Sequence, residues 1–384
     1  MIGSGPAGLT AAYYLARMGH GVTVFEALPF PGGMMRFGIP EYRLPRDVLE
    51  SEIQEIQKAG VEIRTNSRIE SLDSLFLDQG FDAVLVALGR QASLKLPLPG
   101  TGLEGVWNGL SFLKDFNLLK KVETGNRILV LGGGNVAFDC ARVARRLGAE
   151  EVGIACLESR EGLSATPEEI EQGEEEGITI YPSRTFTEIL KEEGKITGVA
   201  CLRVASFEFD QDGKPEIETI EGSHHVLTAD TIILAVGQLP DVPEPFDLDL
   251  DERGFIETDP YTFDTSAEGV FAAGDAVPGS ASVIEAVASG RRGAAALDKY
   301  LGGDGEIDKN LAPPAEATPW LGPGEGFADL KRCREPKIGG AERVKSFCSI
   351  SQTMDEETAG YESARCLQCD LRLGITPVRF WGDY

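Results

Sequence analysis

A glycine-rich loop near the start of the chain, Gly3-Ser4-Gly5-Pro6-Ala7-Gly8, constrains the fold more than any other stretch. In a strand-turn-helix unit that binds a dinucleotide, the first glycine permits the tight turn and the second lets the backbone approach the pyrophosphate. The third packs the following helix, predicted over residues 9–18, closely against the sheet. The pyrophosphate lies on backbone N–H groups at the helix N-terminus. The loop therefore predicts a dinucleotide-binding βαβ unit.

The second strand of this unit is predicted over residues 21–26, a β-branched and apolar run that ends in Glu26. Glu26 follows Gly8 by 18 residues, close to the ~20-residue spacing at which an acid binds ribose hydroxyls. Glu26 is a candidate ribose ligand, and a solvated acid at a strand end is the alternative. Only Met1 and Ile2 precede the loop, whereas the unit needs a buried strand there. We expect residues upstream of Met1, or a neighbouring chain, to complete the sheet.

The pattern occurs a second time along the chain. Gly132-Gly133-Gly134-Asn135-Val136-Ala137 is a Gly-x-Gly-x-x-Ala loop that follows an apolar strand and opens a helix predicted over residues 138–147. Each loop is followed by an Asp-led apolar strand that ends in glycine, over residues 81–90 and 229–238. The equivalent positions, each 148 residues apart, are Asp82 and Asp230, and Gly89 and Gly237. Two such sets predict two dinucleotide-binding units.

A further apolar strand, residues 269–275, ends in Gly274-Asp275 and precedes a helix predicted over residues 282–297, with Ser282 as its cap. An acid at a strand end beside a helix N-terminus offers a carboxylate for sugar hydroxyls and backbone N–H groups for an anion. Asp275 is therefore a candidate ligand, and a helix-capping aspartate is the alternative.

Charge and cysteine usage limit the classes of function. The 384 residues carry a net charge of -26, which argues against nucleic acid or an anionic membrane as the main partner, because both attract basic surfaces. The seven cysteines are an odd number and show no secreted-type disulfide framework. No apolar run approaches the ~20 residues that span a bilayer. We expect a cytoplasmic protein without membrane insertion.

Three other segments are given no chemical role. Residues 92–122, rich in glycine and proline, are expected to connect the two units. The acidic run Glu174-Glu175-Glu176 is interpreted as a solvated helix face. Residues 210–213 are interpreted as the turn of a hairpin.

Taken in order, these motifs resemble the flavoprotein family of the glutamate synthase small chain, whose module also occurs in dihydropyrimidine dehydrogenase and in the large subunit of NADH-dependent ferredoxin:NADP oxidoreductase. Besides both glycine loops, the resemblance rests on Gly38-Ile39-Pro40-Glu41-Tyr42-Arg43-Leu44-Pro45, which is more specific than either loop. It covers about residues 1–305. It implies an α/β fold with two Rossmann-like domains of the pyridine nucleotide-disulfide reductase type, the second inserted in the first. The expected ranges are 1–110 and 243–305 for the FAD-binding domain, 111–242 for the NAD-binding domain and 306–384 for an irregular C-terminal tail.

The resemblance also implies residue roles. The first loop binds FAD, with Glu26 on its ribose, Arg43 near the flavin and Asp275 on the ribityl chain. Backbone at Val283 faces the flavin's pyrimidine edge, where a helix start stabilises negative charge. The second loop binds the nicotinamide nucleotide, and no acid-base residue is required. The candidate FAD ligands are Gly3, Gly5, Pro6, Ala7, Gly8, Glu26, Gly33, Arg43, Gly89, Gly274, Asp275 and Val283. The candidate NAD ligands are Gly132, Gly134, Asn135, Val136, Glu158, Gly237 and Gln238.

The chain departs from this family where nucleotide choice is made. Members that use NADPH carry Tyr-Arg-Arg after the second strand of the second unit, where guanidinium groups bind the 2'-phosphate. Here the aligned residues are Cys156-Leu157-Glu158. Glu158 follows Ala137 by 21 residues, and a carboxylate there binds a free diol and repels a phosphate. We therefore expect NADH to be preferred over NADPH, although Arg160 offers an alternative phosphate contact.

The tail departs as well. In the relatives an iron-sulfur domain with a Cys-x-x-Cys segment precedes the flavin module, whereas here Cys366 and Cys369 lie near the C-terminus. Two thiolates provide half of a four-ligand site. Cys333 and Cys348, or a partner chain, could supply the others. We expect an iron-sulfur cluster, in preference to zinc, and two ordinary reduced cysteines are the alternative.

The function implied by the resemblance is hydride exchange between NAD(H) and FAD, with electrons passing through iron-sulfur centres to a catalytic partner subunit of a redox complex. One alternative is a free-standing disulfide reductase, which needs a cysteine pair beside the flavin. The units contain no such pair. Another alternative is a structural flavoprotein subunit that nicotinamide does not reduce.

Overall fold

The computed structural model describes residues 1–209, 215–279, 282–307 and 326–366. The chain forms two compact units. The first comprises residues 1–307 together with 339–349, and the second comprises residues 308–338 and 350–384.

The first parallel sheet is built around the start of the chain. Ile2 forms parallel bridges to Phe25 and Val86, so residues 1–3 lie between two strands, as the glycine loop requires. The sheet strands are β1 (Thr23–Phe25), β2 (Glu62–Arg64), β3 (Val84–Val86) and β15 (Val270–Ala272). The helices of this part are α1 (Pro6–Arg17), α2 (Met34–Phe37), α3 (Arg46–Lys58) and α7 (Val283–Tyr300). This part also contains a short π-helix, η1 (Ser74–Asp78), and two short 3-10 helices, η2 (Glu244–Phe246) and η3 (Gly274–Ala276).

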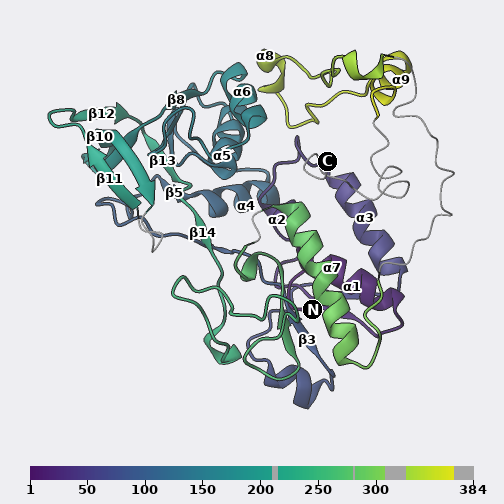
Figure 1. Cartoon of the computed structure of the whole chain (residues 1–384). Helices are drawn as coiled ribbons and strands as arrows, with labels where there is room; N and C mark the ends of the chain where they lie inside the picture. Colours follow the sequence, from purple (N-terminus) through teal and green to yellow (C-terminus); the bar gives the residue numbers. More distant parts are fainter. Residues whose placement is uncertain (210–214, 280–281, 308–325, 367–384) are drawn as a thin grey trace, which may run out of the picture. The chain divides into compact units, whose positions relative to one another are not determined.

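Helices α1 and α7 lie side by side against this sheet (Figure 1). Their close approach depends on Gly290, because a Cβ there would collide with the Ala7 carbonyl. The apolar residues of α1, including Ala11, Ala12 and Leu15, are buried against Val24. This packing fixes the helix N-terminus above the carboxyl ends of the strands.

The second parallel sheet repeats the arrangement of the first. Its strand order is β5-β13-β6-β7-β8, and all the pairs are parallel. In both sheets the strand before the glycine loop lies centrally, between the next strand in sequence and the later Asp-led strand. The elements are β5 (Val106–Asn108), α4 (Gly109–Leu119), β6 (Arg127–Leu131), α5 (Asn135–Arg146), β7 (Glu151–Ala155), α6 (Pro167–Glu175), β8 (Thr179–Tyr181) and β13 (Thr231–Leu234). The predicted α/β fold with two Rossmann-like domains is confirmed.

Most of the expected connector, residues 92–122, belongs to this second domain. It contains β5, which pairs with β13, and α4, which packs against α5. The second sheet therefore begins at Val106, before the predicted boundary at residue 110. The chain passes from the first domain to the second, and back again, at the short antiparallel pair of β4 (Ala92–Ser93) with β14 (Gln238–Leu239).

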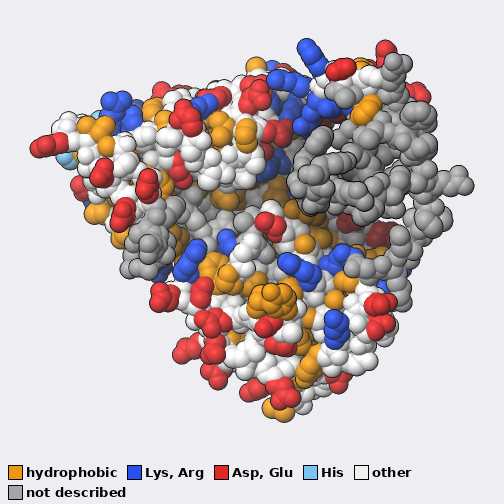
Figure 2. Space-filling model, viewed as in Figure 1, with side chains coloured by type: hydrophobic (Ala, Val, Ile, Leu, Met, Phe, Trp, Pro, Cys, Tyr) orange, Lys and Arg blue, Asp and Glu red, His pale blue; other side chains and the backbone are white. Residues whose placement is uncertain are grey.

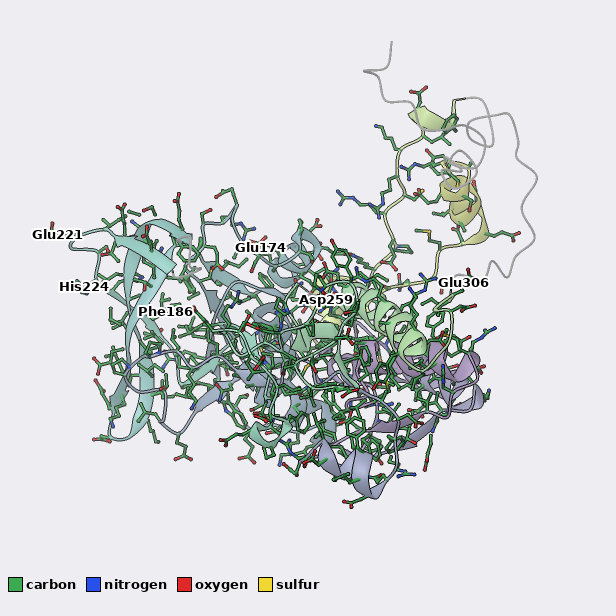
Figure 3. All side chains as sticks on the ribbon, turned by 60° about the horizontal axis from the view of Figure 1, so that its bottom comes forward. Glu174, Phe186, Glu221, His224, Asp259 and Glu306 are labelled. Carbon is green, nitrogen blue, oxygen red and sulfur yellow. The ribbon has the colours of Figure 1, made fainter. Side chains whose placement is uncertain are left out.

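An antiparallel sheet packs on the second domain. Its strands are β9 (Arg184–Glu192), β10 (Lys195–Phe209), β11 (Pro215–Thr219) and β12 (His225–Thr228). Phe186 lies on β9, and Glu221 and His224 mark the turn between β11 and β12 (Figure 3). The antiparallel pairing of β10 with β11 confirms the predicted hairpin, whose turn lies outside the described residues.

The tail contributes to both units. In the first unit, α8 (Gly340–Arg343) packs against α6, and the Phe347 ring lies 4.5 Å from the Phe116 ring. In the second unit lie η4 (Phe327–Asp329) and α9 (Glu356–Ser363).

The protein surface carries charges of both signs. On the face drawn in Figure 2, acidic side chains are dispersed among basic and apolar ones. Within the described residues, no helix combines the length and apolar character needed to cross a membrane.

Candidate functional site

The first glycine loop adopts the geometry that its sequence predicts. A Cβ on Gly8 would collide with the Gly3 carbonyl, which explains the glycine at the first turn of α1. A Cβ on Gly5 would meet no atom within 4 Å, so this residue faces open space at the helix start. Gly33 packs on the loop from the other side, since its Cβ would lie 2.7 Å from the Gly5 Cα.

Glu26 lies directly beside this loop and is 7% exposed. Its carboxylate accepts hydrogen bonds from the backbone N–H of Ser4 at 3.1 Å and of Leu28 at 2.8 Å, and from the Ser4 hydroxyl. Ser4 is a site residue that the sequence did not single out. These contacts hold the acid at the end of β1, where the ribose of a dinucleotide is expected.

Asp275 lies in η3, between the end of β15 at Ala272 and the start of α7 at Val283. One carboxylate oxygen, Oδ1, is buried and has no hydrogen-bond partner among the described residues. Burial raises the pKa of this carboxyl. The Ser282 hydroxyl accepts a hydrogen bond from the Glu285 N–H at 3.3 Å, so Ser282 caps α7 as predicted, and Val283 opens that helix.

A cavity of about 570 Å³ joins these groups. It also reaches the second domain, since the start of α5 contributes to its wall. The predicted residues that line it are Gly3, Gly5, Pro6, Ala7, Glu26, Gly33, Arg43, Gly89, Asn135, Val136, Gln238, Asp275 and Val283. The predicted residues outside its lining are Gly8, Gly132, Gly134, Glu158, Gly237 and Gly274.

The second glycine loop has the same local design. A Cβ on Gly132 would collide with the Ala235 carbonyl, and Gly132 has φ +135°. Gly134 precedes α5 in an extended conformation. The Glu158 carboxylate lies beside this loop, 2.9 Å from where a Cβ on Gly133 would be. Its position relative to the loop is thus analogous to that of Glu26.

Arg43 makes a contact that its sequence position did not predict. Its Nη1 donates to both carboxylate oxygens of Asp139, at 2.9 and 2.8 Å. Its Nε lies 2.9 Å from a Glu169 oxygen. Arg43 and Asp139 both line the cavity. Asp139 and Glu169 gave no sequence signal of their own, because their importance depends on Arg43, which lies 96 and 126 positions away from them.

The acidic run in α6 is not simply solvated, contrary to expectation. Glu174 and Glu175 are exposed, but Glu176 is 3% exposed. Its carboxylate pairs with Arg142 at 2.8 Å and Arg146 at 2.5 Å. Burial opposes ionisation of Glu176, but these two guanidinium groups lower its pKa. The C-terminal end of α6 turns this acid toward α5, which a run of three identical residues could not reveal.

The predicted cluster ligands remain predictions. Cys348 belongs to the first unit, Cys333 and Cys366 belong to the second, and Cys369 lies outside the described residues. No group of three or more His, Cys, Asp or Glu side chains within the described part of the chain could hold a metal ion.

The residues of the cavity fit a dinucleotide such as FAD. Gly5 leaves room for a pyrophosphate at the start of α1. The unpartnered Oδ1 of Asp275 can accept a hydrogen bond from a sugar-type hydroxyl. The start of α7 offers backbone N–H groups to an anionic ring edge.

Comparison with protein families gives one match over most of the chain. The model described as pyridine nucleotide-disulphide oxidoreductase matches residues 1–290.

Three similar proteins are named as subunits or chains of redox enzymes. The NADP(+)-dependent formate dehydrogenase subunit beta of Moorella thermoacetica is 39% identical, over 100% of this chain and 56% of the relative. The NADPH-Fe(3+) oxidoreductase subunit beta of Geobacter sulfurreducens is 33% identical, over 96% and 61%. The glutamate synthase [NADPH] small chain of Escherichia coli is 33% identical, over 78% and 68%. The chain thus spans only 56% to 61% of the length of the first two.

Solved structures agree on the fold. FprA of Mycobacterium tuberculosis in complex with NADPH superposes with a TM-score of 0.67 at 19% identity, over 78% of this chain and 84% of that chain. Thioredoxin reductase of T. acidophilum gives a TM-score of 0.59 at 22% identity, over 78% and 97%.

Proposed function

Because the chain belongs to the pyridine nucleotide-disulphide oxidoreductase family, in the group similar to the glutamate synthase small chain, we propose that it is an FAD-dependent NAD(P)H oxidoreductase subunit of a multi-subunit redox complex. The observation that carries this proposal is the cavity shared by the first glycine loop, Asp275 and the start of α5. This single cavity would hold both the flavin ring and the nicotinamide ring.

In this proposal the protein binds and orients, while the cofactor supplies the chemistry. When bound, FAD accepts a hydride from a nicotinamide and can release the electrons singly. The first loop and Glu26 would hold the nucleotide end of FAD, and Asp275 its ribityl hydroxyls. The N-terminus of α7 would stabilise negative charge on the flavin ring. No side chain is assigned a proton-transfer role.

Stopped-flow mixing of the FAD-loaded chain with NADH or NADPH tests the proposal. We expect rapid loss of the visible absorption of oxidised flavin. Failure of both nucleotides to reduce the flavin at high concentration would favour the structural-subunit alternative. The disulfide reductase alternative is disfavoured because none of the described residues lining the cavity is a cysteine. Burial also raises the pKa of Cys156 to about 12 and that of Cys201 to about 11, which makes them poor nucleophiles.

We further propose that Glu158 makes NADH the preferred nucleotide. The names of the three similar proteins point to NADP(H), so this proposal rests on Glu158 and its surroundings. Arg160, the alternative phosphate contact, pairs instead with Glu174 at 2.6 Å; Glu174 is labelled in Figure 3.

Steady-state kinetics with both nucleotides check this choice. We expect Glu158→Arg to raise kcat/KM for NADPH relative to NADH by about 10-fold or more, because removal of a repulsive carboxylate is combined with a new phosphate contact. Glu161→Gln, on the same exposed loop, is the control and should leave the ratio unchanged. A wild-type protein with the higher kcat/KM for NADPH would refute the preference.

The partners are also proposals. We propose that electrons pass to iron-sulfur and catalytic subunits, with Cys366 and Cys369 as cluster ligands. Iron and sulfide analysis of the native complex, compared with a Cys366→Ser/Cys369→Ser variant, tests the ligands. Equal iron content in the two would exclude them. Mass spectrometry of copurifying subunits identifies the partner.

A further inference from the structure

The most specific sequence segment, residues 38–45, lies at the contact between the two dinucleotide-binding domains. Just before it, the Phe37 carbonyl accepts a hydrogen bond from Asn117 Nδ2 on α4 at 2.9 Å. Just after it, Arg46 donates to Asn117 Oδ1 at 3.0 Å. Within it, Arg43 contacts α5 and α6. Residues 37–46, the segment with one flanking residue on each side, therefore touch three helices of the second domain.

The Arg43 contact is the buried part of this interface. The side chain of Arg43 is 26% exposed, whereas those of Asp139 and Glu169 are 6% and 7% exposed. Two buried carboxylates close together need a cation between them. Arg43 supplies that cation: its Nη1 contacts both oxygens of Asp139, and its Nε contacts Glu169. Burial opposes its charge, but the neighbouring charges of Asp139 and Glu169 raise the pKa of Arg43.

A second layer of charges holds the Glu169 carboxylate in place. The other oxygen of Glu169 lies 2.5 Å from Arg142, whose side chain is fully buried. Arg142 also binds Gln172 at 2.8 Å and Glu176 at 2.8 Å. The guanidinium groups of Arg142 and Arg146 lie 4.9 and 3.9 Å from the centre of the Tyr42 ring. Tyr42 belongs to the same segment as Arg43, so both residues insert into the charge layer of α5 and α6.

The position of this contact relates it to the reaction. Asp139 lies one helical turn after Asn135, and both line the cavity together with Arg43. A rotation of the second domain that moved Asn135 away from the first glycine loop would have to break the Arg43 ion pairs.

We propose that Asp139 and Glu169 are positioning residues that act through Arg43 to hold the nicotinamide-binding domain against the flavin-binding domain in the orientation needed for hydride transfer. This inference rests on the proposed function. It assigns the residues no direct contact with the reacting atoms.

The rate of flavin reduction separates positioning from binding. In Asp139→Asn and Glu169→Gln, we expect the rate constant at saturating nicotinamide nucleotide to fall at least ~10-fold, since small misplacements of reactants are costly. FAD content and the apparent Kd of the nucleotide should change less than ~3-fold. Glu41→Gln, which breaks the exposed interdomain pair of Glu41 with Lys120, is the matched control and should retain the wild-type rate.

The pH profile provides a signature that a purely structural role would lack. Burial raises the pKa of Asp139 to about 7, against the lowering effect of Arg43; Glu169 on α6 adds to the rise and Arg142 on α5 opposes it. Protonation of Asp139 below this pH removes its charge and weakens the pair with Arg43. We expect flavin reduction by the wild type to slow as the pH falls through about 7, and the Asp139→Asn profile to lose that step.

Amide hydrogen exchange gives a readout that does not depend on activity. Without nucleotide, Asp139→Asn and Arg43→Lys should exchange faster than wild type in residues 37–46, while the strands of both sheets keep their protection. If wild-type flavin is not reduced by either nucleotide, the proposed function fails, and exchange alone still tests the domain contact. Unchanged exchange in residues 37–46, or a folded, FAD-loaded Asp139→Asn reduced at the wild-type rate, would overturn the inference.

Discussion

The Asp275 carboxylate has one buried oxygen that no described residue satisfies. If a ribityl hydroxyl fills this place, Asp275→Ala removes a hydrogen bond to a charged group, worth about 1.5–3 kcal/mol. We expect FAD affinity to fall by about 10-fold or more, and Asp275→Asn, which retains an acceptor, to lose less. Titration of the apoprotein with FAD, followed by flavin fluorescence, measures both. Equal affinities for wild type and Asp275→Ala would remove Asp275 from the site.

An added methyl group should have different effects at two glycines of the first loop: at Gly5 it should weaken FAD binding, and at Gly8 it should lower stability. Gly5 has φ -70° and open space at its Cβ position, so Gly5→Ala should leave apoprotein stability nearly unchanged while it obstructs the pyrophosphate. Gly8→Ala would force a Cβ into the Gly3 carbonyl and should destabilise the fold by about 3 kcal/mol. Urea unfolding and FAD titration of both variants test this contrast. A Gly5→Ala variant that binds FAD normally would contradict it.

The charge layer between α5 and α6 makes a prediction about these helices. Glu176→Gln leaves Arg142 and Arg146 without their shared counter-ion in a buried site, and should cost about 3–5 kcal/mol of unfolding free energy. Glu174→Gln breaks only the exposed pair with Arg160 and should cost less than about 1 kcal/mol. Urea unfolding at neutral pH compares the two. Similar losses would mean that the buried layer is not what joins α5 to α6.

The stability lost in Glu176→Gln depends on pH with a known sign. The pKa of Glu176 is lowered in the folded protein, so its stabilising contribution is complete above the unfolded pKa of about 4.3. It is lost as the pH falls through the lowered folded value. The stability difference between wild type and Glu176→Gln should therefore shrink in acid.

The tail segment 339–349 is expected to contribute to the stability of the first unit, to which it belongs. Arg343 is 3% exposed and pairs with Glu175, and the Phe347 ring packs against the Phe116 ring. Compared with a chain that ends after residue 349, a chain that ends after residue 307 should have a free energy of unfolding about 2 kcal/mol smaller. Its melting temperature should be roughly 5 °C lower. Thermal unfolding of the two truncated chains tests this. Equal melting temperatures would show that the segment only rests on the surface.

Local patterns determined most of the fold. The glycine loops, Glu26, the capped start of α7 and the duplicated Asp-led strands depend on a few neighbouring residues and on backbone geometry that only glycine allows. The paired loops therefore predicted two Rossmann-like domains, which the two matching parallel sheets confirm. The same local reasoning missed the role of residues 92–122, because pairing of β5 with β13 joins positions more than 120 residues apart.

The two dinucleotide-binding folds follow from the amino-acid sequence alone, since each loop carries its own turn, helix start and acid. The contact between the two domains, in contrast, depends on how distant elements pack. Arg43 lies before α3, Asp139 lies on α5, and Glu169 and the buried Glu176 belong to α6 and its C-terminal end. The burial and the partner of each charge depend on how these elements pack. The conformation of the first glycine loop depends on neighbouring residues, whereas the contact between the two domains depends on residues that only the folded chain brings together.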